Sequence, residues 1–277
     1  MTTMWGFRGG ARWAMVLAAF SVLLVASPPT YAQFVSGSDG SDGAITFSVP
    51  SGLSSVVLDF NPRTICSQVG VSCTKTAGPG SSVELDTDGD NVYHFTTVTV
   101  GQSVSLRLLA KNMRNPGPVV WLALGDVTFN RYSTLDLYAQ NGHVGGQNYS
   151  VRTPSEPGPG GYPGGVGAKP GDLPGAGGGP GAGAVPSSEM GCSAGHVIAL
   201  STVRCSGGGA KYGTDSIQPL VGGSGGSGGH AYGTFMGAGG GAGGGAIRIT
   251  SGGTLTLPRE GFVNVRGGYT RDRQNGG

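Results

Sequence analysis

The sequence predicts an all-β protein: a short right-handed parallel β-helix, or β-solenoid, with an N-terminal β cap and a long glycine-rich insertion. Two observations lead to this fold class. Apolar–polar–apolar triplets recur in pairs at a fixed spacing, and 57 of the 277 residues are glycine. Average glycine usage is about 7 %, so glycine is enriched about threefold. The absence of a strict Gly-X-Y period excludes collagen.

Three copies of one strand template predict the solenoid. In each copy two triplets flank five residues, and alternate side chains of each triplet point to opposite faces of a strand. The paired triplets are 98–100 with 106–108, 127–129 with 135–137, and 255–257 with 263–265. The first copy begins at position 98 and the second at position 127, a spacing that suits one coil of a solenoid. Antiparallel hairpins of a β-sandwich are the alternative, and the copied spacing favours the solenoid.

The third copy begins only at position 255, so the chain is expected to leave the stack after the second copy and return to it. This predicts coils at 92–142, a glycine-rich insertion at 143–245 and a returning coil at 246–277, which could be truncated. We therefore expect Leu255-Thr256-Leu257 to pair in parallel with Val127-Thr128-Phe129. The strand patterns at 44–49 and 54–60 fall in a less regular segment, 33–91, which is expected to cap the first coil.

The same alignment predicts which side chains stack on one another. Two outward columns are expected: Thr99, Thr128 and Thr256 in one, and Arg107, Asp136 and Asn264 in the other. Neighbouring coils lie about 4.8 Å apart, so Arg107 and Asp136 are expected to pair across coils. The inward apolar positions expected to supply most of the burial are Val98, Val100, Val127, Phe129, Leu255 and Leu257.

The glycine-rich insertion has two interpretations. As a disordered loop, it would lose much backbone entropy on ordering and has little apolar surface to offset that loss. As packed polyproline II segments, it would use glycine to let backbones approach one another closely. A staple between Cys192 and Cys205 would favour partial order.

The segment 1–32 matches a secretory signal peptide. Arg8 and Arg12 precede an apolar run at 14–26, and Thr30 and Ala32 are the small residues expected before a cleavage site. The run is shorter than the roughly 20 residues that span a bilayer, so no membrane span is expected after the signal is removed. We therefore expect a secreted or cell-surface protein.

The four cysteines are expected to form disulfides in an oxidising compartment. Three connectivities are open, and pairing Cys66 with Cys73 and Cys192 with Cys205 closes the shortest loops. A metal site built from Cys192, His196 and Cys205 is a weaker alternative, because it lacks a fourth ligand nearby and the close cysteine spacing of zinc motifs.

One acidic motif resembles a cation-binding turn. Asp86, Asp88 and Asp90 alternate in "DTDGDN", a spacing that lets several carboxylate oxygens converge on one Ca²⁺. Asn91 and Thr97 stand where an EF-hand needs glycine and glutamate, so the motif is not an EF-hand. The alternatives are a looser calcium site and a plain turn leading into a strand. The doubled Ser-Asp-Gly at 38–43 is most simply two turns. No other cofactor is expected.

Composition excludes two function classes and leaves one enzymatic alternative. Charged residues make up 12 % of the chain with a formal net charge of +2, and no basic stripe suggests nucleic-acid binding. No helix is expected after any glycine run, which excludes a phosphate-binding loop. Asp126, Asp136 and Arg107 could form the acidic and basic cluster of a polysaccharide-cleaving β-helix enzyme, although a solvated face is the simpler explanation.

Four segments carry a family resemblance: "GSDGSDGAITF", "LDTDGDNVYHFTTVTV", "VVWLALGDVTFNRYSTLDL" and "GGGAGGGAIRITSGGTLTL". They resemble segments of bacterial secreted glycine-rich parallel β-helix proteins, often loosely labelled PE-PGRS-like, although this chain lacks the helical N-terminal PE domain. The resemblance implies architecture and no catalytic residues. We therefore expect an exported structural or adhesin-like surface protein that binds surface glycans or other cell-surface proteins. A polysaccharide lyase or hydrolase and a fragment of a larger fibrous protein are the alternatives.

Overall fold

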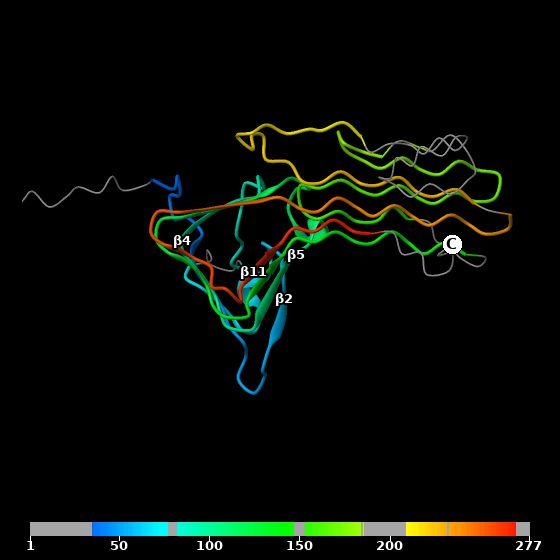
Figure 1. The fold of residues 1–277 in the computed structure, drawn as a ribbon. Coiled ribbons are helices and arrows are strands. Elements are labelled where there is room, and N and C mark those ends of the chain that lie inside the picture. The colour runs from blue at the N-terminus through cyan, green and yellow to red at the C-terminus, as the bar shows by residue number, and fades with distance from the viewer. Residues whose placement is uncertain are drawn as a thin grey trace, which may run out of the picture. The chain divides into compact units, whose positions relative to one another are not determined.

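The computed structural model of the chain describes residues 35–76, 82–146, 153–183, 185, 209–231 and 233–269. These residues form an all-β structure with eleven strands and two single-turn 3-10 helices, η1 (Ile65–Ser67) and η2 (Ala110–Asn112). The strands build two sheets, one of seven strands and one of four (Figure 1). Within this described part, no helix is long and apolar enough to cross a membrane.

All pairs in the four-stranded sheet are parallel. Its order is β11–β8–β5–β2. The bounds are β2 (Val56–Phe60), β5 (Val104–Leu108), β8 (Thr134–Asp136) and β11 (Phe262–Asn264). Its register aligns one inward column of apolar residues, Leu58, Leu106, Leu135 and Val263. Each strand of this sheet thus belongs to a different layer of one stack.

The seven-stranded sheet repeats these layers and is also parallel, apart from one pair. Its bounds are β1 (Gly43–Phe47), β3 (Val71–Cys73), β4 (Val92–Val100), β6 (Val119–Ala123), β7 (Val127–Phe129), β9 (Ile247–Ser251) and β10 (Leu255–Thr256). The long strand β4 pairs with β6 along its first half and with β7 along its second half, and β9 and β10 then continue the two halves.

The predicted return of the chain to the stack is confirmed. Leu255 lies opposite Val127 and Thr256 opposite Thr128, in parallel, although the whole glycine-rich insertion separates the partners in the sequence. β11 adds to β8 across the same insertion, and β9 adds to β6. The strand pattern that begins at Ile247 is therefore the last layer of a stack begun earlier in the chain.

The segment 33–91 contributes both a layer and an edge strand. β1 and β2 pair in parallel with β4 and β5, so they continue both ladders by one layer. β3 instead lies antiparallel to β1, on the edge of β1 that faces away from β4. The predicted disulfide between Cys66 and Cys73 is confirmed and ties β3 to η1. An edge covered in this way cannot pair with another chain through β1.

The core lies between the two sheets and is rich in aromatic side chains. The ring of Phe60 meets that of Tyr93 edge-on with centroids 5.2 Å apart, and Phe95 meets Trp121 edge-on at 5.9 Å. The predicted inward positions Val98, Val100, Val127 and Phe129 are buried. Leu255 and Leu257 are not: about half of each side chain is exposed, at 51 % and 50 %. They lie in the last layer, which no further described strand covers.

Outward columns follow the predicted register and extend one layer further. Thr46 joins the threonine column of Thr99, Thr128 and Thr256. We call Asp59, Arg107, Asp136 and Asn264 the charged column. The expected pair of Arg107 with Asp136 is wrong: the Arg107 guanidinium binds Asp59 at 2.7 Å, and Asp136 accepts a hydrogen bond from the Asn264 side chain at 2.7 Å. Asp59, one layer earlier, was absent from the predicted column.

Three stretches of the described glycine-rich insertion are packed, extended segments rather than a loose loop (Figure 1). We call 159–168, 222–229 and 237–246 the glycine-rich bundle. The N–H groups of Gly237, Gly240, Gly243 and Ala246 donate to the carbonyls of Ala168, Gly165, Tyr162 and Pro159. Gly223, Gly226 and Gly229 donate to Gly244, Gly241 and Ala238, and Tyr162, Gly165 and Ala168 donate to Gly223, Gly226 and Gly229.

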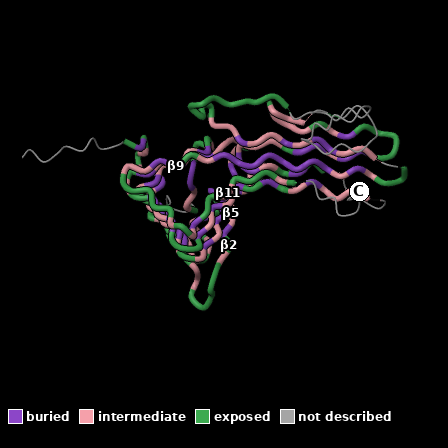
Figure 2. The backbone as a smooth tube through the Cα atoms, in the orientation of Figure 1, coloured by how far each residue is buried: buried purple, intermediate pink, exposed green. Residues whose placement is uncertain are grey.

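Along each segment the donors of these hydrogen bonds are three residues apart, which is the period of a polyproline II helix. Figure 2 shows buried residues along these segments as well as in the sheets. A side chain would not fit at the closest approaches: a Cβ added to Gly243 would overlap the carbonyl oxygen of Gly223. The bundle is therefore held by backbone hydrogen bonds between segments far apart in sequence.

Candidate functional site

The acidic motif forms a tight turn immediately before β4. Asp86 and Asn91 adopt positive φ angles of 48° and 62°. The Asp86 carboxylate accepts hydrogen bonds from the backbone N–H groups of Asp90 at 3.1 Å and Asn91 at 3.3 Å. The Asp90 carboxylate in turn accepts from the N–H of Val92 at 2.7 Å. Asp86 and Asp90 therefore each close part of the turn that precedes the strand.

The turn brings three carboxylates together. One oxygen each from Asp86, Asp88 and Asp90 lies within 4.8 Å of the others. Among the described residues, no lysine, arginine or histidine forms an ion pair with any of them. Three such oxygens would supply part of the six to eight that Ca²⁺ takes. The predicted calcium candidates therefore converge in space, and calcium binding itself stays a prediction.

Asp86 is the buried member of this cluster, with 2 % of its surface exposed. Burial, the hydrogen bond with Asp88 and the negative charge of Asp90 together raise the pKa of its carboxyl to about 7, with burial the largest cause. Removing a carboxylate from water disfavours its charged form, and neighbouring carboxylates act in the same direction. The cluster consequently contains a carboxyl group that titrates near neutral pH.

A fourth acidic residue, Asp42, supports the turn and was not predicted. It is 3 % exposed, and its carboxylate accepts from the N–H of Asp86 at 3.3 Å and from the N–H of His94 at 2.9 Å. The ammonium group of Lys75 binds it at 2.7 Å. The doubled Ser-Asp-Gly does form turns, with positive φ at Gly40 and Gly43. The spacing of this Ser-Asp-Gly repeat gives no sign that the Asp42 carboxylate contacts the turn at Asp86, which comes much later in the chain.

The possible catalytic group of Asp126, Asp136 and Arg107 is distributed over both sheets. Asp126 immediately precedes β7 in the seven-stranded sheet, where its carboxylate accepts from the N–H of Thr254 at 2.7 Å. Arg107 and Asp136 lie in the four-stranded sheet within the charged column. Each of the three side chains thus has a role in joining layers.

Cys192, His196 and Cys205 lie outside the described residues, as does segment 1–32, for which a signal peptide is predicted. The pairing of Cys192 with Cys205 and the alternative metal site therefore stay predictions.

No protein-family model, no curated protein and no solved structure matches this chain.

Proposed function

We propose that the chain is an exported, non-catalytic, adhesin-like protein that binds surface glycans along the charged column. Its scaffold, in this proposal, is a short right-handed parallel β-helix. Two sheets that are both extended by parallel strands from layer to layer support the solenoid. The right hand follows because connections between parallel strands of one sheet are almost always right-handed. The signal-type sequence at 1–32 supports export.

The single observation that supports glycan binding is the chemistry of the charged column. Carboxylates, a guanidinium and an amide follow one another on successive layers about 4.8 Å apart. These groups offer both acceptors and fixed donors to the hydroxyls of a sugar polymer. The side chains of Arg107 and Asp59 remain 35 % and 42 % exposed, so a ligand can reach them.

An aromatic side chain lies next to this column. Tyr138 follows β8, is 36 % exposed, and lies close enough to the Arg107 guanidinium to contribute to its raised pKa. An aromatic ring combines an apolar face with a polar hydroxyl, which suits the mixed surface of a sugar ring. The hydrogen bond to Asp59 raises the pKa of Arg107, with Tyr138 contributing less, so the guanidinium stays charged and fixed in place. The column thus offers a preorganised polar surface rather than a closed reaction site.

Retention on polysaccharides tests the proposal. The purified protein, screened against immobilised polysaccharides, is expected to be retained without releasing new reducing ends. The double variant Arg107→Ala and Asn264→Ala should lose retention, because it removes the column's guanidinium and its outermost amide. The matched control is Thr99→Ala with Thr128→Ala, which alters the outward column of the other sheet. Release of reducing ends would instead establish the enzymatic alternative, and equal retention of all variants would exclude the charged column.

A further inference from the structure

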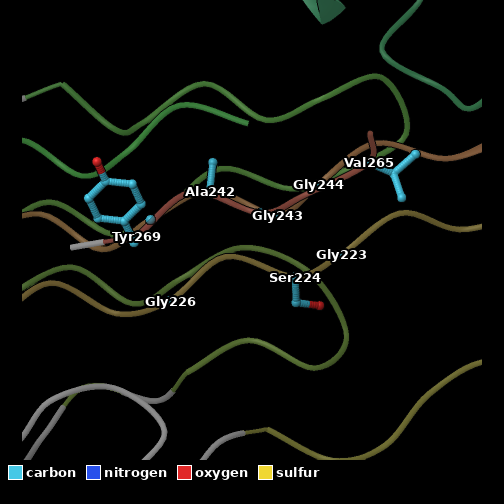
Figure 3. Close-up of a pocket in the computed structure, with 11 residues that line it drawn as sticks. Gly223, Ser224, Gly226, Ala242, Gly243, Gly244, Val265 and Tyr269 are labelled. Carbon is cyan, nitrogen blue, oxygen red and sulfur yellow. The ribbon is translucent and has the colours of Figure 1, made fainter. Parts of the chain in front are cut away.

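One pocket of about 500 Å³ lies outside the charged column, beside the glycine-rich bundle. Its walls are two bundle segments and the chain that follows β11. Besides glycine, Ser224, Val265 and Tyr269 line it, and Figure 3 shows Tyr269 and Val265 on one wall and Ser224 on another. The pocket is partly open, so a ligand can reach its walls.

The backbone of this pocket offers hydrogen-bond donors that the bundle does not use. Along 237–246, N–H groups at every third position bind segment 159–168, and those of Gly239, Ala242 and Gly245 bind the carbonyls of His143, Gln140 and Leu137. The remaining N–H groups on the pocket wall, those of Gly241 and Gly244, have no acceptor among the described residues. On the other walls, the backbone N–H groups of Ser224 and Gly267 also have no acceptor among the described residues.

From this arrangement we propose that the pocket binds one further polyproline II segment, supplied by a proline-rich partner polypeptide. Gly241 and Gly244 are three residues apart, so their N–H groups repeat with the period of a polyproline II helix. The carbonyls on one face of an incoming helix repeat with that same period and can accept from both. Prolines carry carbonyls but no N–H, which suits a wall of unused donors.

The other faces of the bundle support this occupant. Each bundle segment already pairs with neighbours through hydrogen bonds at three-residue intervals, so the partner would extend a packing mode that is present. Tyr269, 56 % exposed, adds the kind of aromatic surface on which proline-rich segments dock. A second copy of this chain is a less suitable source, because the segments 159–168, 222–229 and 237–246 are engaged in its own bundle. This proposal does not depend on glycan binding by the charged column.

The test uses the full chain and a synthetic oligoproline that spans the length of the pocket. Amide NMR is expected to show saturable shifts at Gly241, Gly244 and Gly267, because new hydrogen bonds deshield the donating protons. Tyr269→Ala should weaken binding about tenfold, the loss of one good contact. Gly267→Val should abolish binding by filling the pocket, since a Cβ there would contact only Ala242 and Gly244, at 3.3 and 3.6 Å.

The matched control is Tyr132→Ala, which removes a similarly exposed tyrosine between β7 and β8 and should bind like the wild type. Three results would overturn the proposal: no saturable shifts, shifts confined to residues outside the pocket, or equal affinity of the Tyr269→Ala variant. Concentration-dependent self-association that oligoproline does not reverse would also overturn it, by identifying a second copy as the occupant.

Discussion

At the scale of single residues, Asp86 is the group whose chemistry the fold changes most clearly. Its carboxyl is buried against Asp88 and Asp90, and its pKa rises from the ordinary 3.8 to about 7. Its carboxylate oxygens still accept two backbone N–H groups that close the turn. The Asp86 side chain therefore stabilises the turn by accepting hydrogen bonds, whereas its negative charge, when buried, destabilises the turn.

This conflict predicts a pH dependence of stability. Below pH 3.8 the carboxyl is protonated in both the folded and the unfolded chain. Between 3.8 and about 7 the unfolded chain loses this proton while the folded chain keeps it, so the free energy of unfolding falls as pH rises. Asp86→Asn keeps an acceptor oxygen and removes the titration. Urea unfolding in EDTA at pH 5 and pH 8 should show the variant gaining stability relative to the wild type at pH 8.

Asp126→Asn serves as the control, because Asp126 lies outside the cluster and also accepts a backbone N–H. Parallel pH profiles for the wild type and Asp86→Asn would contradict this prediction.

Calcium provides a second prediction for the same cluster. Above pH 7 the three carboxylates repel one another, and a divalent cation would remove that repulsion. Millimolar Ca²⁺ is therefore expected to raise the thermal midpoint of the wild type at pH 8, and to raise it much less in Asp88→Asn. Calorimetry with Mg²⁺ as the control ion measures this directly. If Ca²⁺ and EDTA give the same midpoint, the cluster is only a turn.

At the scale of elements, the glycine-rich bundle shows what close backbone packing requires. Its segments donate to one another every third residue, so the positions that face a neighbouring backbone have no room for a side chain. A glycine that faces open space carries no such constraint. The bundle thus depends on particular glycines rather than on glycine content as a whole.

Two glycine-to-alanine variants separate these cases. Gly243→Ala places a methyl group on the Gly223 carbonyl oxygen and is expected to open the bundle. Gly229→Ala places its methyl group 3.6 Å from the Ala238 backbone and should be tolerated. Limited proteolysis within 209–246 should therefore accelerate strongly in Gly243→Ala alone. Similar cleavage of both variants would show that the glycines act only through composition.

The strands and the glycine-rich bundle also show which parts of the fold could be predicted from the sequence. The triplet spacing correctly predicted the pairing of Leu255 with Val127, because alternating strands must align their apolar faces. It missed the layer of β1 and β2, where the longer segment 48–57 replaces the usual five-residue gap between triplets. It could not decide between a disordered and a packed insertion. Glycine composition fits both, and the deciding hydrogen bonds join segments far apart in sequence.

The acidic site was predictable to a similar degree. Asp86, Asp88 and Asp90 are local, so their spacing alone indicated that they converge. Asp42 reaches the same turn only because β1 pairs with β4, and that pairing belongs to the layer that the template missed. The charged column lacked Asp59 for the same reason, and Arg107 was consequently assigned the wrong partner.

At the scale of the whole described structure, stability is expected to fall toward the last layer of the stack. Leu106 in β5 is fully buried between neighbouring layers, whereas Leu255 in β10 occupies an inward position that is half exposed. The inward position in the last layer is thus more exposed than the inward position in an inner layer. Each layer of this stack pairs only with the layers next to it, so an end layer has about half the support of a central one.

This gradient is measured by the same substitution at the two positions. Leu106→Ala should cost about 2–5 kcal/mol of unfolding free energy, the usual range for a buried leucine. Leu255→Ala should cost about 1 kcal/mol, because roughly half of its side chain is already in water. Urea unfolding gives both values, and amide hydrogen exchange should show β10 and β11 opening before β5. Equal losses at the two sites would mean that the last layer is covered in solution.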